Sequence, residues 1–161
     1  KSLKSNNGIY LVPAFTGLGA PYWAVNARGV LSGLTRDTGP KEIVRATVES
    51  VAYQTHDLFE AMKNDGLKPK IIKIDGGMVK NNWFSQFLAD IVNIKVLRPA
   101  VDETTALGAA FMAGLQIGIY KSLKDISKNW HVDRTFHPKM KLSNRKKLIT
   151  GWDKAIKKTL S

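Results

Sequence analysis

The sequence contains no cysteine among its 161 residues. Disulfide bonds and thiolate-ligated metal sites are therefore excluded within it. Its three histidines, His56, His131 and His137, lack the spacing of a metal-binding motif such as H-E-x-x-H. We therefore predict no metal site built from the side chains of this chain.

Long hydrophobic runs are also missing. The longest stretch of small and apolar residues, 106–120, is interrupted by Gln116 and is shorter than the roughly 20 residues that a membrane span requires. Residues 1–7 are polar and lack the apolar centre of a signal peptide, so we predict that they form a linker or an entering loop. These features predict a soluble, cytoplasmic chain.

Acidic residues are scarce, since 13 Asp and Glu face 25 Lys and Arg and leave a formal charge of +12. Such a charge raises nucleic acid as a partner. The basic residues are spread along the chain, however, and the densest group, in residues 139–158, alternates with apolar side chains. That alternation predicts a terminal helix over residues 143–160 with one solvated basic face. The sequence also lacks an aromatic platform for stacked bases, so nucleic acid is not predicted as a partner.

The length and the 43% hydrophobic content suffice for one domain with a core, over residues 1–161. Short runs at 9–12, 29–34, 71–74 and 95–97 are typical of strands. Between the second and third runs, Pro40 follows the candidate caps Asp37 and Thr38 and predicts a helix that ends near residues 64–66. We expect this helix to bury one face, composed of Val44, Val48, Val51, Ala52, Leu58, Phe59 and Met62. Strands alternating with helices indicate the α/β class.

Residues 13–29 combine glycines and prolines with Phe15, Tyr22 and Trp23. Glycine and proline interrupt regular structure, whereas large aromatic side chains favour burial. We therefore predict a packed loop that covers an edge of the core.

The sequence after the fourth strand begins with two acids, Asp102 and Glu103. A catalytic carboxylate pair is one interpretation, but adjacent side chains diverge and acids are favoured at a helix start, so capping is preferred. The helix that follows, 106–114, consists of small residues and is predicted to pack closely on a sheet. An irregular segment with Trp130 and Phe136 is expected between residue 120 and the terminal helix.

The most informative stretch is residues 71–82, in which a β-branched strand is followed by Asp75, Gly76 and Gly77 and then by Asn81, a good first residue for a helix. Unpaired N–H groups and the helix dipole gather at such a turn, where α/β proteins commonly hold nucleotides. The stretch is neither the dinucleotide pattern G-x-G-x-x-G nor the phosphate loop G-x-x-x-x-G-K-[ST]. Taken alone, it fits a tight turn without a ligand equally well.

Several segments, in order along the chain, resemble the glycerol kinase branch of the FGGY carbohydrate kinases. Residues 13–29 resemble that branch's glycine-rich aromatic loop, and residues 29–49 match the second signature pattern of the family. Residues 75–82 resemble its adenosine motif, residues 105–110 its late helix and residues 151–152 its terminal helix. Xylulose and gluconate kinases carry a different loop in place of residues 17–23, so the glycerol kinase branch is preferred.

The resemblance implies a ribonuclease-H-like, actin-like ATPase fold, of which this chain is an incomplete C-terminal half. It implies ATP or ADP with Mg²⁺ as cofactors of the full enzyme, and glycerol as the acceptor that becomes sn-glycerol 3-phosphate. Gly77 and Asn81 match the ADP-binding positions of the family, Gly76 provides the turn, and Met78 is placed along the base. A side chain at Gly77 would stand between the backbone and the nucleotide. Asn81 can both cap the helix and donate a hydrogen bond to the ligand, and capping alone is the alternative.

Family members are much longer, so the resemblance also implies a missing N-terminal domain that carries the general base and most glycerol contacts. We predict no catalytic residue within these 161 and no glycerol kinase activity from this chain alone. An uncovered apolar surface is further expected to favour a homo-oligomer. Ala24 and Val25 stand where the family usually has Asp-Pro, so the role of that aspartate is lost.

Two alternatives to a glycerol kinase part remain from the residues: a fragment of another FGGY sugar kinase, and a non-catalytic basic interaction module. The adenosine motif separates the second alternative from the kinases, because a scaffold has no need for Gly76 and Gly77 at that place.

Overall fold

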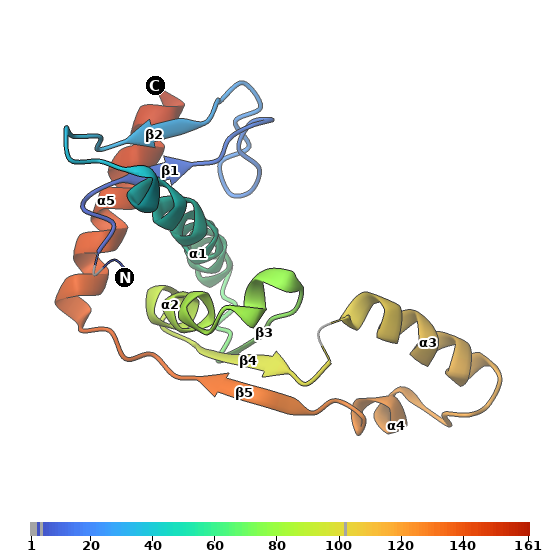
Figure 1. The fold of residues 1–161 in the computed structure, drawn as a ribbon. Helices are drawn as coiled ribbons and strands as arrows, with labels where there is room; N and C mark the ends of the chain where they lie inside the picture. Colours follow the sequence, from blue (N-terminus) through green and yellow to red (C-terminus); the bar gives the residue numbers. More distant parts are fainter. Residues whose placement is uncertain (1–2, 4, 102) are drawn as a thin grey trace.

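The computed structural model describes residue 3, residues 5–101 and residues 103–161. Strands and helices alternate along the described residues, which confirms the predicted α/β class (Figure 1). The strands are β1 Tyr10–Val12, β2 Val30–Ser32, β3 Ile71–Lys73, β4 Lys95–Pro99 and β5 Val132–Phe136. The helices are α1 Pro40–Asn64, the 3₁₀ helix η1 Gly77–Lys80, α2 Asn82–Val92, α3 Thr104–Gln116, α4 Leu123–Ser127 and α5 Leu142–Leu160.

The described strands form two separate sheets. Strands β1 and β2 pair antiparallel, with Leu11 opposite Leu31. In the second sheet β4 is central, parallel to β3 and antiparallel to β5, so that Val96 lies beside both Ile72 and Phe136. The parallel β3–β4 pair, connected through α2, is the unit that carries the glycine turn.

The core lies where α1 packs against α2 and β1, with α5 running along β1 and β2 (Figure 1). Aromatic rings connect three of these helices: Tyr53 of α1 stacks on Trp152 of α5 at 5.2 Å and meets Phe87 of α2 edge-on at 5.7 Å. Trp152 is fully buried. Aromatic pairs of this kind contribute about 0.5–1.5 kcal/mol beyond the burial of their surface.

The buried face of α1 differs from the predicted one. Val44 is 63% exposed and Leu58 41% exposed, whereas Glu49 and Asp57 are buried. Polar groups are tolerated in a core only when they are hydrogen-bonded, and these two acids are. The oxygens of Glu49 accept from Asn6, Arg45 and Tyr53, and Oδ2 of Asp57 accepts from the hydroxyl of Tyr22 and the indole N–H of Trp152.

The N-cap of α1 lies one or two residues later than predicted. Gly39, rather than Asp37 or Thr38, is the N-cap, and its N–H donates to Oε2 of Glu42 at 3.0 Å. Thr38 instead closes the preceding turn, where its Oγ1 accepts from the N–H of Thr35 at 2.8 Å. Pro40 lies in the first turn, as predicted.

Residues 13–29 form a loop that is only partly packed. Leu18 is buried and pairs with Ala24 across the loop, while the Tyr22 hydroxyl reaches Asp57. The expected burial of the other two aromatic rings is wrong, since Phe15 is 74% and Trp23 75% exposed.

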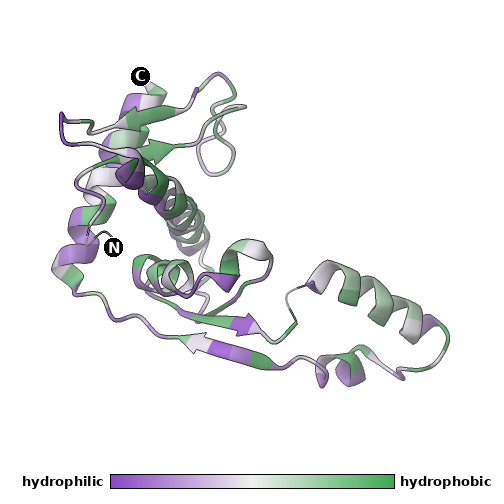
Figure 2. Ribbon diagram, in the orientation of Figure 1, coloured by the Kyte–Doolittle hydropathy of each residue, from purple (hydrophilic) through white to green (hydrophobic). Residues whose placement is uncertain are grey.

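Helices α3 and α4 lie at the far end of the β4–β5 ribbon, away from α1 and α5 (Figure 1). The predicted close packing of α3 on a sheet is wrong: Gly114 is its only buried residue among those described. Most of α3 is apolar (Figure 2), and Met112 is 49% exposed. The segment beyond residue 120 is more regular than predicted, because it forms α4 and β5.

Glu103 holds the N-cap position of α3 without a side-chain hydrogen bond, so its predicted capping is not realised; Asp102 lies outside the described residues. The other ends of the helices agree with the sequence to within a few residues, with α5 starting at Leu142. No helix in the described part of the chain has the length and apolar character to cross a membrane.

Candidate nucleotide site

The turn after β3 gives the site its shape. Gly76 has φ +88°, a conformation that side chains other than glycine rarely adopt, and its carbonyl accepts from the N–H of Val79 at 3.2 Å. Helix η1 then carries the chain from Gly77 to Lys80, a turn of 3₁₀ helix that the sequence did not predict. A Cβ built on Gly76 or Gly77 meets no atom within 4 Å, so the space in front of both glycines is open.

Asn81 ends this turn and starts α2. Its Oδ1 accepts from the N–H of Trp83 at 3.0 Å and from that of Phe84 at 3.3 Å, which confirms the predicted cap. In the part of the chain that the structure describes, no acceptor is paired with its Nδ2. The side chain is exposed, so this amide can serve a ligand while the oxygen serves the helix.

Arg98 of β4 holds the turn from behind. Its guanidinium donates to the carbonyl of Val79 at 2.9 Å and to Oδ1 of Asn82 at 3.0 Å, and it is paired with Asp133 of β5. The buried hydroxyl of Ser85 donates to the same carbonyl of Val79 at 3.0 Å. The hydrogen bonds from the charged guanidinium are stronger than neutral ones. Together with the bond from Ser85, they fix η1 against the sheet.

An apolar hollow of about 390 Å³ lies beside Asn81, at the N-terminal ends of α1 and α2. Its walls include Val44, Val48 and Trp83. The guanidinium of Arg45 lies 4.8 Å from the centre of the Trp83 ring. Val44 was predicted to be buried but is exposed, and its side chain lines this hollow.

The charge of Arg45 is balanced from within the core. Its Nε lies 2.7 Å from Oε1 of Glu49. Burial raises the pKa of Glu49, an effect that the hydrogen bonds from Arg45, Tyr53 and Asn6 oppose. Burial likewise raises the pKa of Tyr22 well above its ordinary range, and the neighbouring Asp57 adds to the shift.

The four residues predicted for the site, Gly76, Gly77, Met78 and Asn81, lie on one exposed segment, and Met78 is 45% exposed. Sequence reasoning missed Arg98, Arg45 and Trp83, which come from other elements. An arginine within an apolar strand, at Arg98, was the one available signal.

No group of acids and histidines among the described residues could hold a metal ion. The arrangement offers a backbone turn, a helix start and an apolar recess, which suits the binding of a ligand.

Comparison with known proteins gives the context of this geometry. The sequence profile of the FGGY family of carbohydrate kinases, C-terminal domain, matches residues 2–117. Glycerol kinase 1 of Pseudomonas aeruginosa is 56% identical over 156 residues, which are 97% of this chain and 32% of that protein. Glycerol kinase of Caldanaerobacter subterraneus is 52% identical over 98% of this chain. The chain thus spans about a third of the length of the curated relatives it matches.

Solved structures agree with the sequence relatives. The structure of Plasmodium falciparum glycerol kinase with ADP superimposes with a TM-score of 0.85 at 38% identity. The match covers 99% of this chain and 32% of the Plasmodium chain. Xylulose kinase of Lactobacillus acidophilus has a TM-score of 0.75 at 24% identity over 94% of this chain, and shows the same fold. The family match spans most of the chain, and fold and sequence agree. The chain therefore belongs to the FGGY family of carbohydrate kinases, in which it corresponds to the C-terminal domain.

Proposed function

We propose that this chain is the nucleotide-binding part of a glycerol kinase, which transfers the γ-phosphoryl group of ATP to glycerol and gives sn-glycerol 3-phosphate. The observation that carries the proposal is the open Gly76–Gly77 turn leading into a helix capped by Asn81. Its relatives support the substrate, since glycerol kinases are 56% and 52% identical to it. The Plasmodium falciparum relative was solved with ADP, which supports the nucleotide.

Each residue of the turn has a distinct role in this proposal. Gly77 lets the nucleotide approach the backbone, and the amide of Asn81 donates to it. The base enters the apolar hollow beside Asn81 and Trp83. Met78, which does not line this hollow, is assigned to the base by the resemblance alone. Arg98 binds no ligand but fixes the position of η1 through the carbonyl of Val79.

The chemistry of transfer depends on positioning and charge neutralisation. When bound with the nucleotide, Mg²⁺ neutralises charge on the phosphates. The general base and most contacts to glycerol are proposed to come from an N-terminal domain, as the resemblance implies. We further propose the cytoplasm as the compartment, because ATP is the phosphoryl donor.

The two roles of Asn81 can be separated by substitution. Asn81→Asp keeps an oxygen that caps α2, because Asp and Asn are comparable caps, but it removes the amide donor and places a negative charge at the ligand. We expect the variant to keep the unfolding free energy within about 0.5 kcal/mol and to bind Mg²⁺–ADP at least about tenfold more weakly. Asn82→Asp is the matched control, because it adds the same charge one residue later, where Arg98 receives it.

The measurement is a titration of the ¹⁵N-labelled chain with Mg²⁺–ADP, followed by amide chemical shifts. Saturable shifts at Gly76, Gly77 and Asn81 in the parent, weakened in Asn81→Asp but not in Asn82→Asp, are the expected result. Equal affinity of the parent and Asn81→Asp would assign Asn81 to capping alone. No saturable shift in the parent would contradict the proposed nucleotide site.

A further inference from the structure

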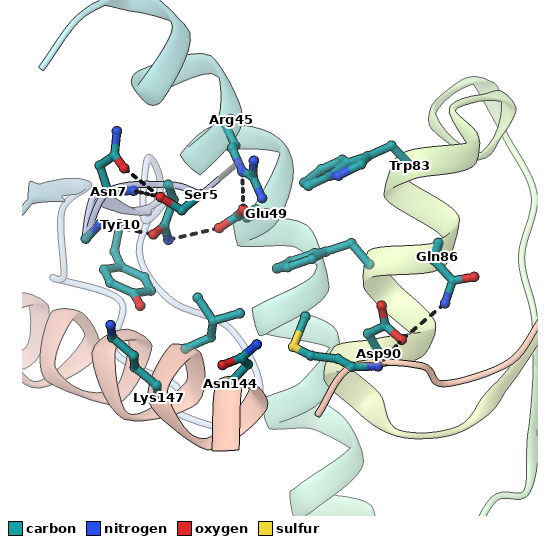
Figure 3. A pocket seen from close by; sticks show the side chains of 15 residues that line it. Ser5, Asn7, Tyr10, Arg45, Glu49, Trp83, Gln86, Asp90, Asn144 and Lys147 are labelled. Carbon is teal, nitrogen blue, oxygen red and sulfur yellow. Dashed lines mark hydrogen bonds and ion pairs between the residues drawn. The ribbon is translucent and has the colours of Figure 1, made fainter. Parts of the chain in front are cut away.

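A second and larger pocket, of about 720 Å³, lies on the other side of Arg45 and Trp83. It is enclosed by residues 5–8, α1, α2 and the beginning of α5 (Figure 3). Gly76, Gly77 and Met78 are not among its lining residues. The proposed function therefore leaves this pocket without a role.

Two carboxylates in the wall of the pocket already accept hydrogen bonds from the protein. Glu49, fully buried, accepts from Asn6 at 2.9 Å, Arg45 at 2.7 Å and Tyr53 at 3.2 Å. Oδ1 of Asp90 accepts from the side chain of Gln86 at 3.1 Å and from the N–H groups of Lys139 at 2.5 Å and Met140 at 3.1 Å, while no donor among the described residues pairs with its Oδ2. The carboxylate of Glu49, which is buried and accepts from three donors, is a poor acceptor for a further cationic group.

The opposite polar wall has a cation without a partner. Figure 3 shows Lys147 and Asn144 rising from α5 toward the pocket. Among the described residues, no acceptor pairs with the ammonium group of Lys147. At this wall of the pocket, an anionic group would give the ammonium of Lys147 a charged partner.

The floor of the pocket is flat and aromatic. The rings of Trp83 and Phe87 stack at 5.1 Å with an angle of 12° between their planes. Leu148 and Met140 add apolar contact. Aromatic faces of this kind pack favourably against another planar ring.

We propose that this pocket binds a small planar aromatic monoanion, with its ring against Phe87 and Leu148 and its anionic group at Lys147. The volume falls in the range of about 300–1,000 Å³ that is usual for small-molecule sites. Apolar walls with a few fixed polar groups are also usual for such sites. The buried bonds between Asn6, Arg45 and Glu49 keep the walls in place before the ligand arrives.

The test uses 2-naphthoate, a bicyclic aromatic carboxylate, titrated into the ¹⁵N-labelled chain without nucleotide. We expect saturable shifts at the Trp83 indole N–H, Phe87, Asn144 and Leu148. The neutral isostere 2-naphthylmethanol is expected to bind about tenfold more weakly or worse, because it cannot form the charge-assisted bond.

Lys147→Gln removes the cation, and we expect it to weaken 2-naphthoate binding about tenfold. Lys146→Gln is the matched control, since Lys146 is the preceding exposed lysine of α5 and does not line the pocket. Its affinity should remain within about twofold of the parent's. The proposal is overturned if 2-naphthoate produces no saturable shifts, if the shifts fall on α3 instead, or if Lys147→Gln binds like the parent.

Discussion

Buried acids on α1 determine how the helices of this domain meet. Asp57 joins the loop of Tyr22 to Trp152 of α5, and Glu49 joins residue Asn6 to α1. Hydrophobic periodicity predicts neither contact, because it assigns the buried face to apolar residues. The hydrogen bonds connect positions up to 95 residues apart, so their partners are visible only in the folded chain.

The buried carboxyl of Glu49 makes the unfolding free energy of the chain depend on pH. Burial raises its folded-state pKa above the reference value of 4.5, so the folded chain holds this proton more tightly than the unfolded chain. The stabilisation that protonated Glu49 contributes is fully present when the pH is below its pKa in the unfolded chain. It is lost as the pH rises through its pKa in the folded chain. Glu49→Gln lacks this titration, and it loses an acceptor, which costs about 1–3 kcal/mol.

The expected result is a parent-minus-variant difference in unfolding free energy that is largest near pH 4 and shrinks toward neutral pH. Urea unfolding of both proteins across that interval measures it. A difference that grows with pH would mean that the ion pair with Arg45 outweighs burial.

Among the elements, those with a strong local signal were predicted and those defined by their neighbours were not. Helix α2 follows from Asn81 and the helical spacing of Phe84, Phe87 and Leu88, all three buried. Strand β5, by contrast, buries only Phe136, and it exists because it pairs with β4. The motif predicts Gly77 and Asn81 as site residues, whereas Arg98 contacts the turn from another strand and depends on a register that sequence does not specify.

The packing of α5 on β1 depends on one glycine. A Cβ added at Gly151 would lie 2.2 Å from the hydroxyl oxygen of Tyr10, whose ring is confined by Tyr53 at 5.7 Å. We expect Gly151→Ala to lower the unfolding free energy by about 1–2 kcal/mol, since overpacking outweighs the higher helix propensity of alanine.

Gly108→Ala in α3 is the control, because a Cβ there meets no atom within 4 Å. It should be neutral or stabilise the chain by up to about 1 kcal/mol. Urea unfolding distinguishes the two variants. If Gly151→Ala is as stable as Gly108→Ala, Tyr10 can move aside and the proposed restraint between α5 and β1 is absent.

The whole chain corresponds to the C-terminal domain of the FGGY carbohydrate kinases. It spans about a third of its curated relatives, and the apolar α3 projects without a covering element among the described residues. Phosphoryl transfer needs a positioned base and donors around the phosphates. We therefore predict that the purified chain does not phosphorylate glycerol at millimolar ATP, as measured by a coupled assay of ADP release. Glycerol-dependent turnover that survives repurification would contradict the proposal that the general base comes from an N-terminal domain.

Calorimetric titration with Mg²⁺–ADP measures whether these 161 residues hold the nucleotide through the Gly76–Gly77 turn. Gly77→Trp places a large side chain in front of the turn, where a Cβ meets no atom within 4 Å, and Gly19→Trp is the control, because a Cβ there also meets no atom within 4 Å. We expect the parent and Gly19→Trp to bind Mg²⁺–ADP, and Gly77→Trp to lose at least tenfold in affinity, on the order of 1.4 kcal/mol. If all three proteins bind equally, or if the parent does not bind, the nucleotide is not held at this turn.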